Sequence, residues 1–140
     1  TGCNVQVTSL AFGDEEVASL MSKFNTACEA HPEVPRPKIM MLMHTYVAES
    51  EELLKKATID VQKFFTYFTK WFKRERPIVQ GLIEPITEQE MAEAAHLQPE
   101  VLRKNVVIGT PAEVIKRLKG YEALGYDQRC AYPHAYRAHQ

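Results

Sequence analysis

The chain has 140 residues, of which 45% are hydrophobic and 25% are charged, which is enough for one domain with a hydrophobic core. Its 17 basic and 18 acidic side chains nearly cancel, which argues against a nucleic-acid-binding or anionic-membrane surface. The sequence contains neither a transmembrane segment nor a signal-peptide pattern. Its three scattered cysteines form no CxxC pair, so we expect a reducing, cytoplasmic setting.

The sequence begins with a predicted strand–helix unit. Polar and apolar side chains alternate over residues 4–9, which predicts a strand with Gln6 and Thr8 on one face and valines on the other. An acidic turn at residues 14–16 then opens a helix, because negative charge suits the positive end of the helix dipole. Apolar side chains recur at helical spacing along it until Pro32 ends the pattern.

A second strand–helix unit follows. Residues 39–47 form a continuous apolar run without alternation, which predicts a strand covered on both faces, as in a parallel sheet. Ser50 is the predicted N-cap of the next helix. An apolar stripe from Leu54 to Phe72 makes this helix long, and Pro77 ends it.

The remaining part of the sequence, after Pro77, is less regular. Residues from about 75 to 105 are interpreted as an insertion that contains a short helix opened by a capping box at Thr87. A second capping box begins at Thr110, and Gly125 is the predicted stop of its helix. Residues 128–140 show neither strand nor helix periodicity and are predicted to be an irregular tail.

Repeated strand–helix alternation predicts an α/β architecture with parallel strands. Two such units cannot cover both faces of the strand at 39–47, and a closed (β/α)8 barrel needs at least ~200 residues. We therefore expect either a piece of a larger fold or assembly with another copy. Large aromatic side chains between Phe64 and Phe72 add apolar surface, so we expect a homo-oligomer with this helix or the strand at 39–47 at the contact.

The second capping box belongs to a longer pattern. Residues 107–114 read Val-Ile-Gly-Thr-Pro-Ala-Glu-Val, and residues 121–127 read Tyr-Glu-Ala-Leu-Gly-Tyr-Asp. This pattern resembles the C-terminal helix of bacterial-luciferase-like flavin-dependent monooxygenases. Residues 46–52 resemble the seventh strand of that family running into its seventh helix, and residues 2–10 fit the sixth strand. The resemblance covers residues 1–127.

The resemblance implies an α/β fold that is a partial (β/α)8 TIM barrel, roughly the sixth strand through the eighth helix, with a helical insertion. It also implies a flavoprotein oxidoreductase in which reduced FMN reacts with O2 to oxidise a small organic substrate; some relatives use a deazaflavin. The first five strands, which carry the main phosphate-binding loop of the family, have no counterpart here, and the eighth strand expected after Asp127 is not recognisable. We therefore expect this chain alone to be inactive.

Polar side chains near the strand ends are the candidate site residues, because barrel active sites form there. We assign Gln6, Thr8 and Ser9 to cofactor binding and His44 and Tyr46 to the substrate pocket. The alternative is that Gln6 and Thr8 only fill the barrel interior and that His44 is a hydrogen-bonded core residue. No catalytic acid, base or nucleophile is identified, and no histidine pair has zinc-ligand spacing, so no metal is expected. Flavin chemistry needs few such groups, because the cofactor performs the difficult step.

Two functional hypotheses follow. The first is the C-terminal part of an FMN- and O2-using luciferase-like monooxygenase that acts on a small molecule and has no nucleic-acid or membrane partner. The second is a non-catalytic, self-associating remnant of the same fold. An upstream in-frame coding segment for five further strands would favour the first.

Overall fold

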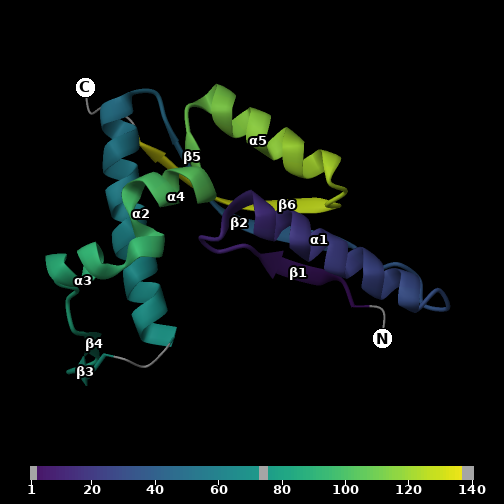
Figure 1. Cartoon of the computed structure of the whole chain (residues 1–140), viewed down its shortest axis with the longest axis horizontal. Coiled ribbons are helices and arrows are strands. Elements are labelled where there is room, and N and C mark those ends of the chain that lie inside the picture. The colour runs from purple at the N-terminus through teal and green to yellow at the C-terminus, as the bar shows by residue number, and fades with distance from the viewer. Residues whose placement is uncertain (1–2, 73–75, 137–140) are drawn as a thin grey trace.

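The computed structural model describes residues 3–72 and 76–136, with side chains as far as residue 131. The main sheet has four strands, which are β1 (Val5–Thr8), β2 (Ile39–Ala48), β5 (Val107–Gly109) and β6 (Gln128–Tyr136). Three long helices pack on it: α1 (Gly13–Ala30), α2 (Glu51–Phe72) and α5 (Pro111–Ala123) (Figure 1). All strand pairs of this sheet are parallel, which confirms the predicted α/β architecture.

A group of short elements connects α2 to β5. The antiparallel strands β3 (Ile78–Val79) and β4 (Leu82–Ile83) form a small hairpin. They are followed by α3 (Glu88–Glu93), the 3-10 turn η1 (Ala95–Leu97) and α4 (Pro99–Asn105). The hairpin and α3 lie beside the C-terminal part of α2, away from the main sheet, whereas α4 lies between α2 and α1 (Figure 1).

Strand β2 is the centre of the sheet because both of its edges are paired. Strand β6 pairs with residues 40–48 along one edge. The other edge is shared end to end, because β1 pairs with residues 39–42 and β5 pairs with residues 45–47. Strand β2, which the sequence suggested as a contact with another copy of the chain, therefore has both edges paired within the described residues.

The handedness of the connections explains which face each helix covers. Helix α1 connects β1 to β2, and helix α5 connects β5 to β6 on the far edge of β2. Both connections therefore cross the sheet in the same direction, away from the edge of β2 that β1 and β5 share. The connection from β2 through α2 runs in the reverse direction, because it leads to β5, on the edge of β2 that β1 and β5 share. A right-handed crossover in the reverse direction places its helix on the opposite face of the sheet. Helices α1 and α5 consequently cover one face, and α2 covers part of the other.

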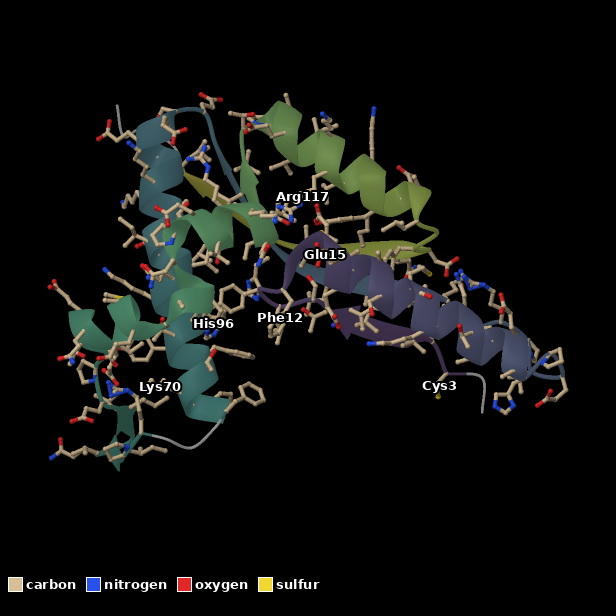
Figure 2. The ribbon with its side chains drawn as sticks, viewed as in Figure 1. Cys3, Phe12, Glu15, Lys70, His96 and Arg117 are labelled. Carbon is tan, nitrogen blue, oxygen red and sulfur yellow. The ribbon has the colours of Figure 1, made fainter. Side chains whose placement is uncertain are left out.

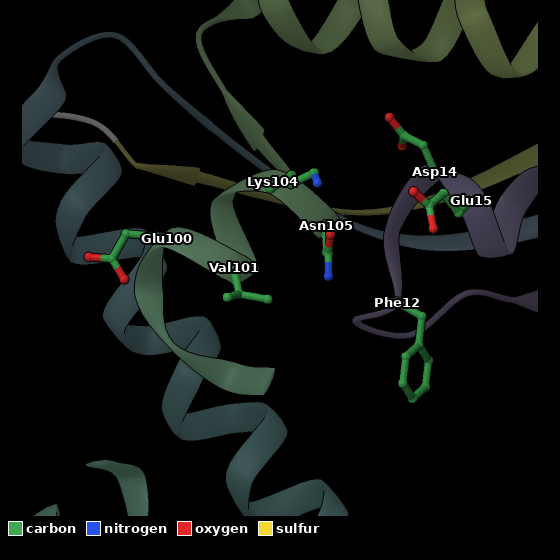
Figure 3. A pocket seen from close by; sticks show the side chains of 7 residues that line it. All are labelled: Phe12, Asp14, Glu15, Glu100, Val101, Lys104 and Asn105. Atoms are coloured by element: carbon green, nitrogen blue, oxygen red, sulfur yellow. The ribbon is translucent and has the colours of Figure 1, made fainter. Parts of the chain in front are cut away.

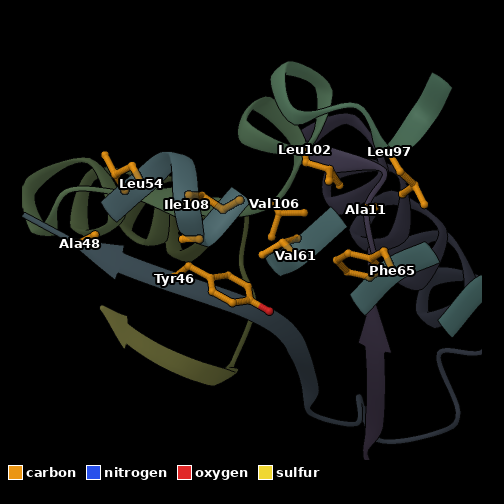
Figure 4. Close-up of a cluster of buried hydrophobic side chains, with 11 residues drawn as sticks. Ala11, Tyr46, Ala48, Leu54, Val61, Phe65, Leu97, Leu102, Val106 and Ile108 are labelled. Carbon is orange, nitrogen blue, oxygen red and sulfur yellow. The ribbon is translucent and has the colours of Figure 1, made fainter. Parts of the chain in front are cut away.

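The two faces of β2 have separate cores. Odd-numbered residues such as Met41 and Met43 are buried against Val17 of α1 and Val114 of α5. Even-numbered residues in the second half of β2 pack under α2 (Figure 4). This second core includes Tyr46, Ala48, Leu54, Val61, Phe65, Leu97 and Leu102. Its last two members come from the predicted insertion, so that part of the insertion contributes to the main core.

The helix boundaries follow the local signals. Both predicted capping boxes are present, with the hydroxyl groups of Thr87 and Thr110 accepting hydrogen bonds from backbone N–H groups three residues later. After α5 the backbone turns at Gly125, whose φ of 99° is a left-handed conformation that glycine adopts without strain. Among the helices of the described residues, none has the length and hydropathy that a bilayer-crossing segment requires.

The prediction of an irregular tail at residues 128–140 is wrong for residues 128–136, which form β6. Two hydrogen bonds to the backbone of Ile39 start this strand, since the Asp127 N–H donates to the Ile39 carbonyl oxygen at 3.1 Å and the Asp127 carboxylate accepts from the Ile39 N–H at 2.9 Å. The second edge of β2 then offers a row of backbone donors and acceptors that need partners. Tertiary pairing therefore overrides the weak strand propensity of this segment. Residues 137–140 lie outside the described residues.

Candidate functional site

Sites in parallel α/β folds form at the carboxyl ends of the strands. Here β1 ends beside the middle of β2, and β5 ends near the end of β2. Each of these two strands runs through a short turn into a helix, α1 after β1 and α5 after β5. The candidate site is therefore built around these turns and on the part of the sheet that no helix covers.

The exposed part of the sheet carries two of the predicted residues. Gln6 and Thr8 are both exposed on β1, whereas the intervening Val7 packs toward α1 and α5. The register places Gln6 beside Met40 and Thr8 beside Leu42. We call this surface the open face; it consists of Gln6, Thr8, Met40, Leu42, Gln128 and Cys130. Its mixture of apolar and hydrogen-bonding groups is typical of one wall of a pocket for an organic molecule.

Ser9 and His44 come together at a small internal cavity. The cavity lies along the edge of β2 where β1 has ended and β5 has not yet begun, and Met43 and Val106 also line it. Its volume is about 10 Å³, which is near the lower limit for a single water molecule. The structure thus joins these two predicted residues, but in a space that cannot admit a flavin ring.

Tyr46 lies apart from them, in the core beneath α2, and is 4% exposed. Burial and the negative charge of Asp60 raise the pKa of its hydroxyl group. The ring of His44 lies at the border of this core, with centroid distances of 5.0 Å to Phe64 and 5.4 Å to Phe65. The predicted site residues therefore occupy three environments, which are the open face, the small cavity and the core.

A larger hollow of about 580 Å³ opens beside the turn that follows β1 (Figure 3). Its lining residues are Phe12, Asp14, Glu15, Glu100, Val101, Lys104 and Asn105. The side-chain amide of Asn105 donates to the carbonyl oxygen of Ala11 at 3.0 Å and so joins the α4 wall to the α1 wall. Gly13 permits this approach, because its φ is 80° and a Cβ there would lie 2.6 Å from the Asn105 side-chain oxygen.

The electrostatics of this hollow disfavour an anion. Three of its lining residues are carboxylic acids, and Lys104 is the basic one. Asp14 is already paired with Arg117 at 2.7 Å, which leaves Glu15, Glu100 and Lys104 to set the local charge. A phosphate group placed here would be repelled, whereas a neutral or cationic organic group would not.

The helix N-termini near the strand ends carry carboxylates of this chain. The first turns of α1 and α2 contain Asp14, Glu15, Glu16, Glu51 and Glu52. At α5 the Glu113 carboxylate accepts from the Thr110 N–H at 2.8 Å, and hydrogen bonding to Thr110 lowers the pKa of this carboxyl group. A helix N-terminus binds phosphate through its N–H groups and its dipole. These carboxylates compete for both, so the described residues do not fit the phosphate end of FMN.

Sequence reasoning did not identify the hollow in Figure 3. Its two walls are distant in the chain, and the Asn105–Ala11 hydrogen bond joins residues 94 positions apart. The signal on the α1 side is Phe12, a large apolar side chain directly before an acidic first turn, which remains 64% exposed. On the α4 side the sequence carries only an ordinary helical pattern.

Comparison with known proteins agrees with this architecture. A solved structure of an F420-dependent secondary alcohol dehydrogenase in complex with an F420–acetone adduct matches 96% of this chain and 38% of its own chain, with a TM-score of 0.59. At 14% sequence identity this likeness shows the fold alone. The fold of the present chain is accordingly part of a TIM barrel, as the sequence predicted.

Two sequence comparisons point to the same family. The oxygenase component of the flavin-dependent trigonelline monooxygenase from Acinetobacter baylyi is 55% identical over 127 residues. The match covers 91% of this chain but 35% of that protein, so this chain spans about a third of the length of its relative. The family model for luciferase-like monooxygenases matches residues 3–128. The chain therefore belongs to the luciferase-like monooxygenase family.

Proposed function

We propose that this chain is the C-terminal part of a cytoplasmic monooxygenase that uses FMN and O2 to oxidise a small organic substrate. The observation that carries the proposal is the 55% identity to the trigonelline monooxygenase component over 91% of this chain. Trigonelline is accordingly the first substrate that we propose to test. The F420-dependent neighbour is 14% identical, so the sequence relationship favours a flavin over a deazaflavin.

The open face is one wall of the cofactor pocket in this proposal. Gln6 and Thr8 offer hydrogen-bonding groups, and Met40 and Leu42 offer apolar contact to a flat ring system. His44 lies where the open face meets α2, and in this proposal its side chain lines the substrate-binding part of the pocket. Bound flavin supplies the reaction with O2, while these side chains orient the ring and exclude water. The phosphate is held by parts of the barrel outside this chain.

The isolated 140-residue chain is expected to bind FMN only weakly, with a dissociation constant above about 100 µM, or less than about 5.5 kcal/mol of binding free energy. The physical reason is that carboxylates flank the helix N-termini where a phosphate would bind. Titration followed by flavin fluorescence measures this affinity, with riboflavin as the control that lacks the phosphate. Micromolar binding of FMN with clear preference over riboflavin would contradict the expectation.

The role of the open face is testable in a chimera in which this chain replaces the matching segment of the Acinetobacter baylyi protein. We expect trigonelline-dependent O2 consumption by the chimera and a roughly fivefold weaker affinity for FMN in its Gln6→Leu variant, since one lost hydrogen bond is worth about 1 kcal/mol. Gln89→Leu is the matched control, because Gln89 is exposed on α3, away from the sheet.

Two results of the chimera experiment would overturn parts of the proposal. Unchanged FMN affinity and kinetics in an active Gln6→Leu chimera would show that Gln6 does not contact the cofactor. A folded chimera without activity would favour the non-catalytic, self-associating remnant instead.

A further inference from the structure

One side of helix α2 carries a row of aromatic side chains. Residues four positions apart lie above one another on a helix, and Phe64, Phe68 and Phe72 follow this spacing. We call these three residues the aromatic row. Their ring centroids lie 5.8 Å apart between Phe64 and Phe68 and 4.5 Å apart between Phe68 and Phe72. The three rings therefore form a continuous aromatic surface along α2.

His44 joins the aromatic row to the open face. Its ring centroid lies 5.0 Å from that of Phe64. On β2, His44 shares a face with Met40 and Leu42, which belong to the open face, because side chains two residues apart point to the same side of a strand. The open face, His44 and Phe64 therefore follow one another without a gap in sequence pattern or contact. A molecule that binds on the open face next to α2 meets the aromatic row.

The ring of Phe64 is exposed, yet its neighbours hold it in place. Phe64 is 41% exposed, whereas the next residue, Phe65, is 2% exposed in the core beneath α2. The two rings meet edge to face, with a centroid distance of 5.3 Å and an interplanar angle of 76°. Phe68 stacks against Phe64 at an interplanar angle of 25°. A side chain that is already ordered loses little entropy when a ligand binds to it.

The chemistry of this surface favours a positively charged ring. The face of a phenylalanine ring carries the negative part of its quadrupole and attracts cations. Asp60 lies one turn before Phe64 on the same side of α2. Asp60 is also close to β2, since its negative charge adds to burial in raising the pKa of the Tyr46 hydroxyl group. A cation beside Phe64 therefore finds aromatic faces and a carboxylate at the same place.

We propose that Phe64 and Phe68, together with His44, form a substrate subsite for a planar aromatic ring that carries a positive charge, such as an N-alkylated pyridinium. The inference rests on the proposed function, in which the open face holds the flavin ring and the substrate binds beside it. The substrate ring contacts the faces of Phe64 and Phe68, and Asp60 balances its charge. Phe64 and Phe68 are accordingly specificity-determining residues, which distinguish a cationic ring from a neutral ring of the same shape.

The FMN-loaded chimera with the Acinetobacter baylyi protein allows the charge preference to be measured by binding. Trigonelline and meta-toluate have the same shape and the same carboxylate, and they differ in the positive charge of the ring. We expect calorimetry to show about tenfold tighter binding of trigonelline, which corresponds to about 1.4 kcal/mol and lies within the range of cation–π contacts. Calorimetry requires no turnover, so it tests the subsite even in a chimera that does not consume O2.

Variants of Phe64 locate the preference. Phe64→Leu keeps an apolar side chain at this exposed position but removes the ring, so we expect the dissociation constant and the KM of trigonelline to rise about tenfold, with binding of meta-toluate and FMN changed less than twofold. Phe64→Tyr keeps the ring and is expected to retain the preference. Ile59→Ala is the matched control, because Ile59 is 45% exposed on the same helix but outside the aromatic row.

The outcomes separate this inference from the proposed function. Equal or absent binding of trigonelline and meta-toluate by the folded chimera would overturn the subsite, and so would a preference that Phe64→Leu leaves unchanged. A preference that Phe64→Leu removes and Ile59→Ala retains supports it. A chimera that binds trigonelline with this preference but does not consume O2 would contradict the proposed activity and leave the assignment of the ring subsite supported.

Discussion

Replacement of Arg117 by alanine is expected to lower the free energy of unfolding by about 3 kcal/mol. The guanidinium group lies where α1, α4 and α5 come together (Figure 2). It donates to the Asp14 carboxylate at 2.7 Å and to the Tyr121 hydroxyl group at 2.8 Å. It also donates to the carbonyl oxygens of residues 104–106 at 2.8, 3.0 and 2.7 Å, which belong to the last two residues of α4 and to the residue that caps it. The Arg117 side chain therefore stabilises the start of α1, the end of α4 and the backbone directly before β5.

The size of the effect follows from what the truncation leaves behind. Three carbonyl groups lose their donor, and Asp14 loses the positive charge that balances it. Because the Arg117 side chain is 18% exposed, water replaces part of these contacts, and the loss stays below that of a fully buried ion pair. Arg117→Lys is expected to recover little, since an ammonium group cannot match the five donors of the guanidinium fork.

Urea denaturation at pH 7, followed by circular dichroism, measures this change. Arg129→Ala is the control, because Arg129 forms a 3.5 Å ion pair with the exposed Glu122. Such surface pairs contribute little to stability. Equal stability of the Arg117→Ala and Arg129→Ala variants would show that the three-helix junction is not held by Arg117.

The elements that the sequence predicted are those with local signals. Alternation over β1 placed Gln6 and Thr8 on one face, and the structure exposes both there. The capping boxes at Thr87 and Thr110 are local as well, because all their partners lie within three residues. The strand β2 was predicted from its apolar run, since a strand buried on both faces needs no alternation.

The part of the site that was not predictable depends on the order of the strands. Periodicity places His44 and Tyr46 on the same face of β2, but it does not show that α2 crosses that face and buries Tyr46. Helix α2 covers that face because the connection from β2 leads back to β5, in the direction opposite to the connections through α1 and α5. A right-handed crossover in that direction places its helix on the opposite face of the sheet. Asn105 contacts the turn after β1 only because α4 ends beside α1, so the hollow in Figure 3 has no counterpart in the linear pattern.

The second large effect concerns alkaline pH. Tyr126 is 5% exposed, and its hydroxyl group donates to the Val17 carbonyl oxygen at 2.7 Å. Burial and the negative charge of Glu16 raise the pKa of Tyr126 to about 12. Burial and a hydrogen bond to the Asp14 carboxylate likewise hold the pKa of Tyr121 well above its ordinary value. Both tyrosines belong to the core between the sheet and helices α1 and α5, so both must stay protonated for that core to remain packed.

Raising the pH from 10 to 12 is therefore expected to lower the free energy of unfolding by about 3 kcal/mol or more. In the unfolded chain these tyrosines release their protons near pH 10, whereas the folded chain retains them, so the stabilisation is complete below pH 10 and falls as the pH rises toward 12. Each retained proton costs about 1.4 kcal/mol per pH unit, or roughly 3 kcal/mol for Tyr126 alone over this interval. Urea denaturation at pH 9, 10 and 11 measures the slope, and Tyr126→Phe is expected to flatten it by about 1.4 kcal/mol per pH unit. The same slope in both proteins, or titration of every tyrosine of the folded chain near pH 10, would show that Tyr126 does not couple protonation to folding.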